Sequence, residues 1–261
     1  MILSPAEIRR RQRKKRLISM FSIVMMLILW YLATEQFELI PPLKFPSPPA
    51  ILETLGQVQS TILEHSVVTL IRVISSFILG SLIGMIVGMV MSRFQIVFAI
   101  LDPIIEAIRP IPPIALVPFF ILWFGIGDFG QILLAGMGCF MVMVISTVEA
   151  VRNVPRIYTQ AAQSLGANTA HIYRTVIIPA IIPELIAGWR VALALAFGLT
   201  IAAELMGAQS GLGFMIMVAR RSLNTQTIFL GILIIGLEAT AVDRLLNTIT
   251  RRLTVWTERS H

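Results

Sequence analysis

Six long apolar runs, almost free of charge, constrain the fold of this 261-residue chain more than any other feature. A stretch of about 20 apolar residues is what a helix needs to cross the hydrocarbon core of a bilayer. The runs cover residues 17–33, 66–91, 97–124, 131–148, 182–206 and 227–246. Because lipid offers no partner to open backbone groups, the runs predict an all-α, polytopic membrane protein with about six transmembrane helices.

Composition and charge agree with this class. Hydrophobic residues make up 56% of the chain and charged residues 13%, whereas soluble domains average roughly 45–50% and about 25%. The net charge is +7, and seven of the 21 basic residues lie between Arg9 and Arg16, directly before the first run. Basic residues beside a span hold that end in the cytoplasm. Topology therefore explains the charge, and we expect no nucleic-acid partner.

The loops predict an orientation. Six spans place both termini on one side, and most remaining basic residues lie in the loops of that side or in the C-terminus. The opposite loops hold only Lys44, Arg220 and Arg221. We therefore expect a multi-pass protein of the cell inner membrane with both termini in the cytoplasm. The first run is longer than the apolar part of a signal peptide and no A-x-A site follows, so an uncleaved helix is expected.

Prolines and glycines divide the chain further. Residues 40–49 read IPPLKFPSPP, which predicts an extended connector. A short amphipathic helix is expected over 50–65, with Ser47 as a candidate cap. Prolines at 110, 112 and 113 break the third run into two helical pieces joined by a kink. Gly80, Gly84 and Gly88 share one helix face and predict close packing against another helix.

The resulting organisation has four parts. Residues 1–16 form a basic cytoplasmic N-terminus, and 17–65 hold the first span and an extracytoplasmic connector. Residues 66–250 form the core, with a cytoplasmic loop at 149–180, and 251–261 form a cytoplasmic C-terminus. Within the loop, a helix is expected to begin at Pro155 and to end or bend at Gly166.

No catalytic constellation stands out in the sequence. The three histidines are not spaced as metal ligands, and Cys139, the only cysteine, can form neither an intrachain disulfide nor a zinc cluster. No G-x-x-x-x-G-K-[ST] phosphate loop is present. The Gly211-Leu212-Gly213 segment lacks the third glycine of a dinucleotide site and predicts a turn. We therefore expect no metal, no cofactor and no enzymatic activity in this chain.

One motif in the cytoplasmic loop is specific. Gln160-Ala161-Ala162 is followed after three residues by Gly166, and after nine more by Val176-Ile177-Ile178-Pro179. This resembles the signature loop of ABC importer permeases, Glu-Ala-Ala, three residues, Gly, nine residues, Ile-x-Leu-Pro. The spacing fits in full, although Gln160 replaces the charged Glu. The resemblance assigns contact with an ATPase to Gln160, Ala161, Ala162, Ser164, Leu165, Gly166 and Pro179.

Further stretches resemble one branch of these permeases, that for taurine, aliphatic sulfonates and nitrate, with taurine permeases the most similar. They are residues 101–106, 109–113, 123–127, 161–167, 202–205, 211–214 and 251–256. The resemblance implies the type I ABC importer permease fold within a larger machine embedded in membrane lipid. A second, identical permease copy completes the pore, ATPase subunits carry ATP and Mg, and a periplasmic or lipid-anchored binding protein delivers the solute.

Five charged residues in or near the spans are candidates for the translocation path: Arg72, Glu106, Arg109, Arg190 and Glu204. Charge inside a membrane is costly and is a functional candidate by default. The alternative is structural, with Glu–Arg pairs between helices or side chains that reach the interface. Arg109, beside the proline break, is the main candidate for compensating an anion in passage; its alternative is a pair with Glu106, three residues away.

Other functions remain open from the sequence. Another ABC permease would carry a phosphonate, an amino acid or a pyrimidine-like precursor. A secondary transporter would need an inverted repeat, which the sequence does not display. A membrane-embedded enzyme would need a paired His or Asp cluster. Co-purification with an ATPase separates these classes.

Overall fold

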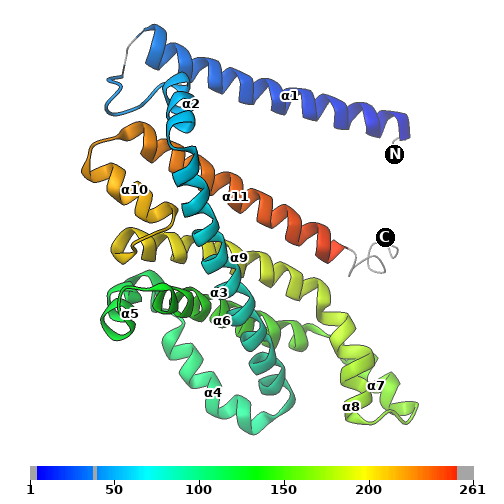
Figure 1. The fold of residues 1–261 in the computed structure, drawn as a ribbon. Coiled ribbons are helices and arrows are strands. Elements are labelled where there is room, and N and C mark those ends of the chain that lie inside the picture. The colour runs from blue at the N-terminus through cyan, green and yellow to red at the C-terminus, as the bar shows by residue number, and fades with distance from the viewer. Residues whose placement is uncertain (1–4, 38–39, 252–261) are drawn as a thin grey trace. The chain divides into compact units, whose positions relative to one another are not determined.

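The computed structural model describes residues 5–37 and 40–251, and within this part of the chain all regular structure is helical (Figure 1). The all-α prediction is therefore confirmed. Most of the predicted C-terminus lies outside the described residues, while residues 5–16 of the basic N-terminus lie in the first helix.

The longer helices are α1 (Pro5–Tyr31), α3 (Gln59–Arg93), α4 (Gln95–Ile108), α6 (Asp128–Asn153), α9 (Ile178–Gly207) and α11 (Thr225–Arg251). The shorter ones are α2 (Pro48–Gln57), α5 (Val117–Phe124), α7 (Arg156–Ser164), α8 (Thr169–Ile172) and α10 (Leu212–Arg221).

Within residues 5–37 and 40–251, four helical segments are long and apolar enough to span a bilayer, and a bent pair makes a fifth candidate. The four cover Leu17–Gln36, Gln59–Arg93, Asp128–Asn153 and Thr169–Gly207. The expected count of about six is thus higher than the four or five found. The sixth predicted run lies in α11, which is not among these candidates.

The predicted break of the third run is confirmed. Helix α4 ends at Ile108, the chain turns through a 3-10 segment at Pro113–Leu116, and α5 follows, with an 83° bend between the two pieces. Pro112 and Pro113 supply no N–H groups, so the helical hydrogen-bond ladder cannot run through this point.

The boundary between connector and core differs from the sequence-based expectation. Helix α2 covers 48–57 and α3 begins at residue 59, so much of the helix expected over 50–65 belongs to the long helix α3. Ser47 is the N-cap residue of α2, as predicted, although its side chain makes no capping bond. Pro48 and Pro49 stand at the first two helical positions and have no N–H for a cap to accept.

The chain divides into two compact units. Residues 1–60 and 216–232 make the first unit, and residues 61–215 and 233–261 make the second. In the first unit the rings of Trp30, Phe45 and Phe229 form a cluster, with centroid distances of 5.5 Å and 4.8 Å from Phe45 to Trp30 and Phe229.

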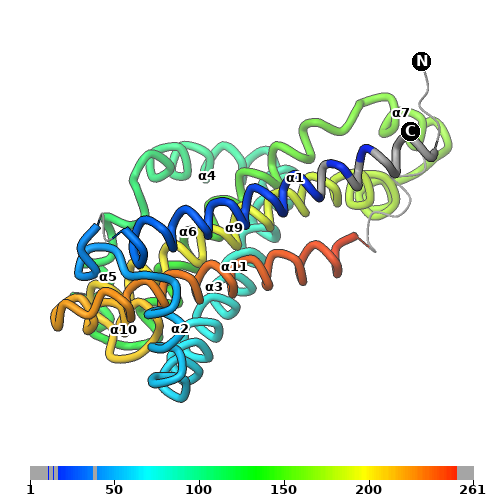
Figure 2. The backbone as a smooth tube through the Cα atoms, turned by 90° about the horizontal axis from the view of Figure 1, so that it is seen from above, coloured from blue at the N-terminus to red at the C-terminus, as the bar shows by residue number. Residues whose placement is uncertain are grey.

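Helices α3, α6 and α9 form the core of the second unit, and α6 and α9 run side by side (Figures 1 and 2). The glycine face of α3 packs directly on α6, as predicted. A Cβ atom built on Gly80 would collide with the backbone oxygen of Gly136, and one on Gly88 would lie 2.7 Å from Cβ of Thr147. Only glycine permits this backbone approach.

Candidate coupling loop and translocation cavity

The cytoplasmic loop of the sequence analysis forms a compact helical excursion at the opposite end of the second unit from α5 (Figures 1 and 2). Helix α7 begins directly after Pro155 and ends at Ser164. Gly166 then adopts a φ of +83°, a left-handed conformation that favours glycine. The N–H of Gly166 donates to the carbonyl of Gln163 at 2.9 Å, which closes the helix. The predicted start and end of this helix are confirmed.

The excursion presents an apolar knob to its surroundings. Leu165 is 89% exposed and Ile157 68% exposed, and no residue of α7 is buried. An open hollow of about 470 Å³ adjoins it, lined by Ala162, Leu165, Gly166, Asn168, His171 and Thr175 among others. Exposed apolar side chains beside a hollow are typical of a surface that docks a partner.

The helical path after the loop begins earlier than the predicted fifth run, which starts at residue 182. It restarts at Thr169, where the Asn168 side chain accepts from the N–H of His171 at 2.9 Å. A π-helical turn over Tyr173–Ile177 then joins α8 to α9, and Pro179 stands in the first turn of α9. Pro179 and Pro183 both lack the N–H that a regular helix would use, which weakens the local hydrogen-bond ladder.

The returning segment contacts the turn between α3 and α4. The hydroxyl of Tyr173 donates to the carbonyl of Ser92 at 3.1 Å. The guanidinium of Arg93 lies 5.7 Å from the Tyr173 ring centroid and 5.1 Å from that of Phe94. The loop is thereby joined to the start of α4, the helix that leads to the proline break.

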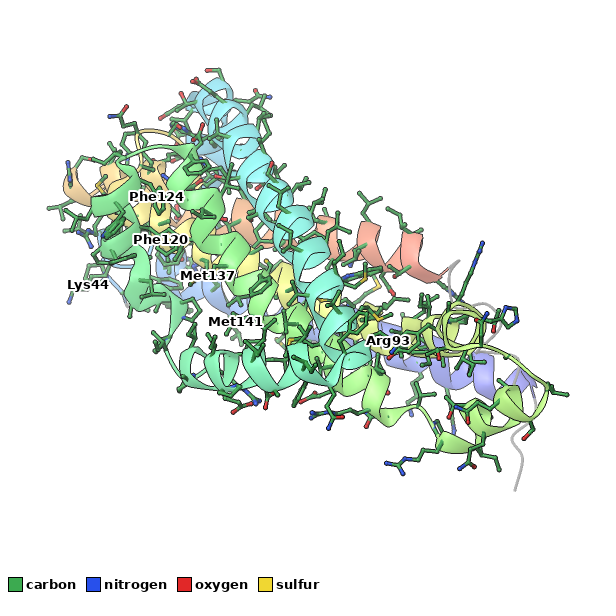
Figure 3. The ribbon with its side chains drawn as sticks, turned by 90° about the horizontal axis from the view of Figure 1, so that it is seen from below. Lys44, Arg93, Phe120, Phe124, Met137 and Met141 are labelled. Carbon is green, nitrogen blue, oxygen red and sulfur yellow. The ribbon has the colours of Figure 1, made fainter. Side chains whose placement is uncertain are left out.

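A cavity of about 350 Å³ lies in the second unit where α4 and the 3-10 segment face α6. Met137 and Met141 lie on the face of α6 that is turned towards α4 (Figure 3). The lining is mostly apolar, with Arg109 and Ser146 as its polar side chains; the apolar members are Ile108, Ile111, Pro113, Leu116, Met137, Met141, Val142, Ile145 and Leu195. A small apolar cavity with few polar groups is the usual form of a small-molecule passage or site.

Arg109 and Glu106 meet as the alternative in the sequence analysis foresaw. Their closest atoms, Arg109 Nη1 and Glu106 Oε1, are 3.4 Å apart, and the side chains are 54% and 60% exposed. An exposed pair of this length contributes little to stability. Because this pair is weak, the Arg109 guanidinium remains available to contact other groups at the edge of the cavity.

Arg72 and Glu204 lie instead in a buried network. Arg72 Nη1 lies 2.8 Å from Glu204 Oε1, and the residues are 3% and 0% exposed. The Arg72 guanidinium also donates to Asp128 at 2.6 Å and to the hydroxyl and carbonyl oxygens of Ser210. The Thr69 hydroxyl donates to the Glu204 carboxylate at 2.9 Å. The network fastens α3 to the start of α6, the end of α9 and the segment after it.

Glycines make room for this carboxylate. The Gly213 N–H donates to Glu204 Oε2 at 2.9 Å, and the Leu212 N–H donates to the Thr69 hydroxyl at 2.8 Å. A Cβ on Gly211, which has a φ of +105°, or on Gly213 would collide with Glu204. The start of α10 thus supplies the Gly213 N–H to the buried carboxylate directly, and the Leu212 N–H to the Thr69 hydroxyl that donates to it. The 211–213 segment was predicted only as a turn.

The fifth candidate, Arg190, pairs with Asp243 of α11. Arg190 Nε is 2.9 Å from Asp243 Oδ1, and the side chains are 50% and 37% exposed. Three of the five candidate charges therefore have a partner far along the chain. Thr69, Asp128, Ser210 and Asp243 were not singled out from the sequence, because each is a common residue whose partner lies more than 50 positions away.

A broken span, a glycine-packed helical core and an exposed helical loop define the class of a membrane permease. Residues 80–255 match the family model described as "Binding-protein-dependent transport system inner membrane component", and the chain belongs to this family of ABC importer permeases. It is accordingly a membrane-embedded, multi-pass transport component and not an enzyme, and ATP hydrolysis is done by separate ATPase subunits.

Named relatives cover nearly the whole chain. The taurine transport system permease protein TauC of Escherichia coli (strain K12) is 37% identical over 89% of this chain and 86% of its own length. The putative aliphatic sulfonates transport permease protein SsuC of Bacillus subtilis (strain 168) is 30% identical over 81% and 77%. The riboflavin transport system permease protein RibX of Chloroflexus aurantiacus is 32% identical over 89% and 88%.

Solved structures agree on the fold. A chain of the inward-facing MetNI methionine ABC transporter has a TM-score of 0.66 at 20% identity and covers 76% of this chain and 98% of its own. A chain of an amino acid ABC transporter has a TM-score of 0.60 at 16% identity, with 76% and 97% covered. At these identities the likeness concerns the fold alone.

Proposed function

We propose that this chain forms the translocation pathway of an ATP-driven importer for a small anion or zwitterion of the taurine or sulfonate type. The observation that carries the proposal is one unit holding both an exposed coupling loop and a cavity edged by Arg109. The names of the TauC and SsuC relatives support the solute class.

The coupling loop is proposed to dock in a groove of an ATPase subunit that carries ATP and Mg. Leu165, at 89% exposure, and the exposed face of α7 supply the knob, while Gln160, Ala161, Ala162 and Ser164 form its helix. The bend at Gly166 fixes the direction of the knob. Contacts of Tyr173 with the α3–α4 turn give a path by which movement of the loop reaches α4.

The cavity is proposed as part of the passage. Arg109 compensates the charge of an anionic group, and the apolar lining keeps binding weak enough for release. Arg72 and Glu204 are proposed to form the frame of the passage, since both are buried and each is bonded to several groups. Arg190, half exposed and paired with Asp243, is proposed to tie α9 to α11.

The complete machine is proposed to contain two copies of this chain, two ATPase subunits and a substrate-binding protein. Both termini and the coupling loop are proposed to face the cytoplasm, as the distribution of basic residues in the loops favours.

Transport by the reconstituted importer tests the passage. In vesicles holding the permease, its ATPase and its binding protein, Arg109→Gln should lower taurine or sulfonate uptake severalfold at unchanged assembly, whereas Arg109→Lys should retain much of it. Solute affinity of the binding protein should not change. If Glu106→Gln restores the uptake lost in Arg109→Gln, or if Arg109→Gln mainly depletes the assembled complex, Arg109 is structural and the proposal for the passage fails.

Cysteine labelling tests docking and orientation. Leu165→Cys adds one accessible thiol to a chain whose native Cys139 is fully buried. This thiol should cross-link to the ATPase and should resist impermeant reagents added outside intact cells. Labelling from outside would reverse the proposed orientation.

A heteroaromatic solute is the second candidate, because the riboflavin permease RibX is 32% identical over a similar share of the chain. Ligand binding by the purified binding protein distinguishes the two: competition by riboflavin and not by taurine favours this second solute.

A further inference from the structure

Three cations of the first unit lie in loops where lysine and arginine are least expected. Lys44 lies in the connector, and Arg220 and Arg221 end helix α10. All three are exposed, and the described residues show no ion pair for any of them. The topology predicted from the sequence places them in the loops opposite the basic N-terminal segment, where lysine and arginine are disfavoured. We call these three residues the connector patch.

Hydrogen bonds bring the two parts of the connector patch together. The Thr225 hydroxyl donates to the carbonyl of Leu43, the residue before Lys44, at 2.5 Å. The Lys44 N–H donates to the carbonyl of Pro41 at 2.9 Å, which fixes the connector as a turn. The Asn224 N–H donates to the carbonyl of Ala219 at 2.9 Å, so the chain folds back around the end of α10.

Two exposed leucines accompany the cations. Leu43 is 64% exposed and Leu223 is 68% exposed. Leu223 is also the one non-glycine residue with positive φ in the described chain, at +55°. A leucine is a poor residue for that conformation, and asparagine or glycine would adopt it with less strain. Its presence there indicates that the apolar side chain makes a contact that offsets the backbone strain.

The contacts of the connector hold it near the end of the apolar segment of α1, where the bilayer interface is expected. The indole N–H of Trp30 donates to the carbonyl of Pro46 at 3.1 Å, which draws the connector back onto α1. Trp30 lies six residues, or about 9 Å of helix, before the end of the apolar segment Leu17–Gln36. Glu35 marks the polar end of that segment. Trp30, which packs with Phe45 and Phe229, is of the aromatic type enriched at membrane interfaces.

We propose that the connector patch binds the headgroup phosphate of an anionic phospholipid while Leu43 and Leu223 insert between the acyl chains beside it. Three cations without a protein counter-charge match a lipid with net negative charge rather than a zwitterionic one. The depth of the connector favours lipid over a water-soluble protein, which would reach a loop projecting from the membrane. The proposal depends on membrane embedding and not on the transported solute, so it can fail while the proposed function stands.

Photoactivatable lipids test the proposal on the full chain in nanodiscs. Phosphatidylglycerol should cross-link to segments 40–47 and 216–225 in preference to phosphatidylcholine, as mapped by peptide mass spectrometry. Removing a cation near a membrane surface should weaken binding about fivefold. Lys44→Gln, Arg220→Gln and Arg221→Gln together should therefore lower phosphatidylglycerol cross-linking at these segments by about a hundredfold.

Matched variants separate charge, apolar contact and folding. Lys44→Arg with Arg220→Lys and Arg221→Lys keeps the charge and should keep cross-linking. Arg156→Gln with Arg174→Gln removes two exposed cations from the coupling loop and should leave cross-linking at the connector unchanged. Leu223→Asn should lower cross-linking without loss of folding, because asparagine suits the backbone conformation. Continued protection of Cys139 from alkylation verifies that each variant is folded.

Three results would overturn the proposal. One is equal cross-linking of phosphatidylglycerol and phosphatidylcholine at these segments. Another is displacement of the lipid by millimolar inorganic phosphate, which would make this a site for the free anion. The third is unchanged lipid cross-linking in the glutamine triple variant together with lost cross-linking to the binding protein, which would make it a protein-docking surface.

Discussion

Removing Arg72 should destabilise the fold far more than its position near the start of a span suggests. Arg72→Met leaves Glu204 as a buried carboxylate without its counter-charge, at 0% exposure. Removing one partner of a buried ion pair lowers the free energy of unfolding by about 3–5 kcal/mol. Asp128, whose side chain is 68% exposed, returns to water and adds little to this cost.

This loss of stability can be measured as a change in the alkylation rate of Cys139. At about 1.4 kcal/mol per factor of ten, the ratio of folded to unfolded chain falls by about a hundredfold to a few thousandfold. Cys139 reports this directly, since it is the only cysteine and has 0% exposure. Its alkylation by a thiol-reactive fluorophore in nanodiscs requires opening of the core. The rate should therefore rise with the population of open chains.

Two further variants make the reasoning specific to the buried pair. Adding Glu204→Gln to Arg72→Met removes the orphaned charge and keeps an oxygen for the Gly213 N–H, so it should recover a large part of the loss. Arg190→Met breaks an exposed pair of similar length and should leave the alkylation rate close to that of the unmodified chain. Equal rates for Arg72→Met and the double variant would show that an uncompensated carboxylate is not the cause, and the reasoning would be wrong.

Two other predictions follow from backbone geometry. Gly80→Ala should lower the thermal unfolding midpoint, followed by circular dichroism, because the added Cβ meets the Gly136 backbone at a cost of about 1–3 kcal/mol. The control variant Gly198→Ala has open space around the added Cβ and should be neutral or stabilising by up to about 1 kcal/mol. A shared effect would argue against close α3–α6 packing. Gly166→Pro cannot adopt a φ of +83° and should preserve membrane insertion while raising the ATP hydrolysed per solute transported, whereas Gly166→Asn should stay near normal. Unchanged coupling in the proline variant would remove the loop from the mechanism.

Much of the permease was predictable because the signals are local. Apolar runs located five of the helical regions that the structure counts as candidate spans, since burial in lipid acts on each run separately. The prolines after Arg109 located the break, because a missing N–H acts on its own helix. Pro155 and Gly166 bracketed α7 for the same kind of reason.

Only the tertiary structure decided which charges far apart in the sequence meet. Arg72 and Glu204 are 132 positions apart and Arg190 and Asp243 are 53 apart, and no local rule relates such residues. The sequence alone therefore left Arg72 among the candidates for the passage, whereas the structure buries it against α6 and α9. The sequence determined that the chain spans a membrane as helices, because hydrophobicity and backbone hydrogen bonding are properties of each segment. Packing decided which polar groups are buried and paired and which face the cavity, because that depends on several helices at once.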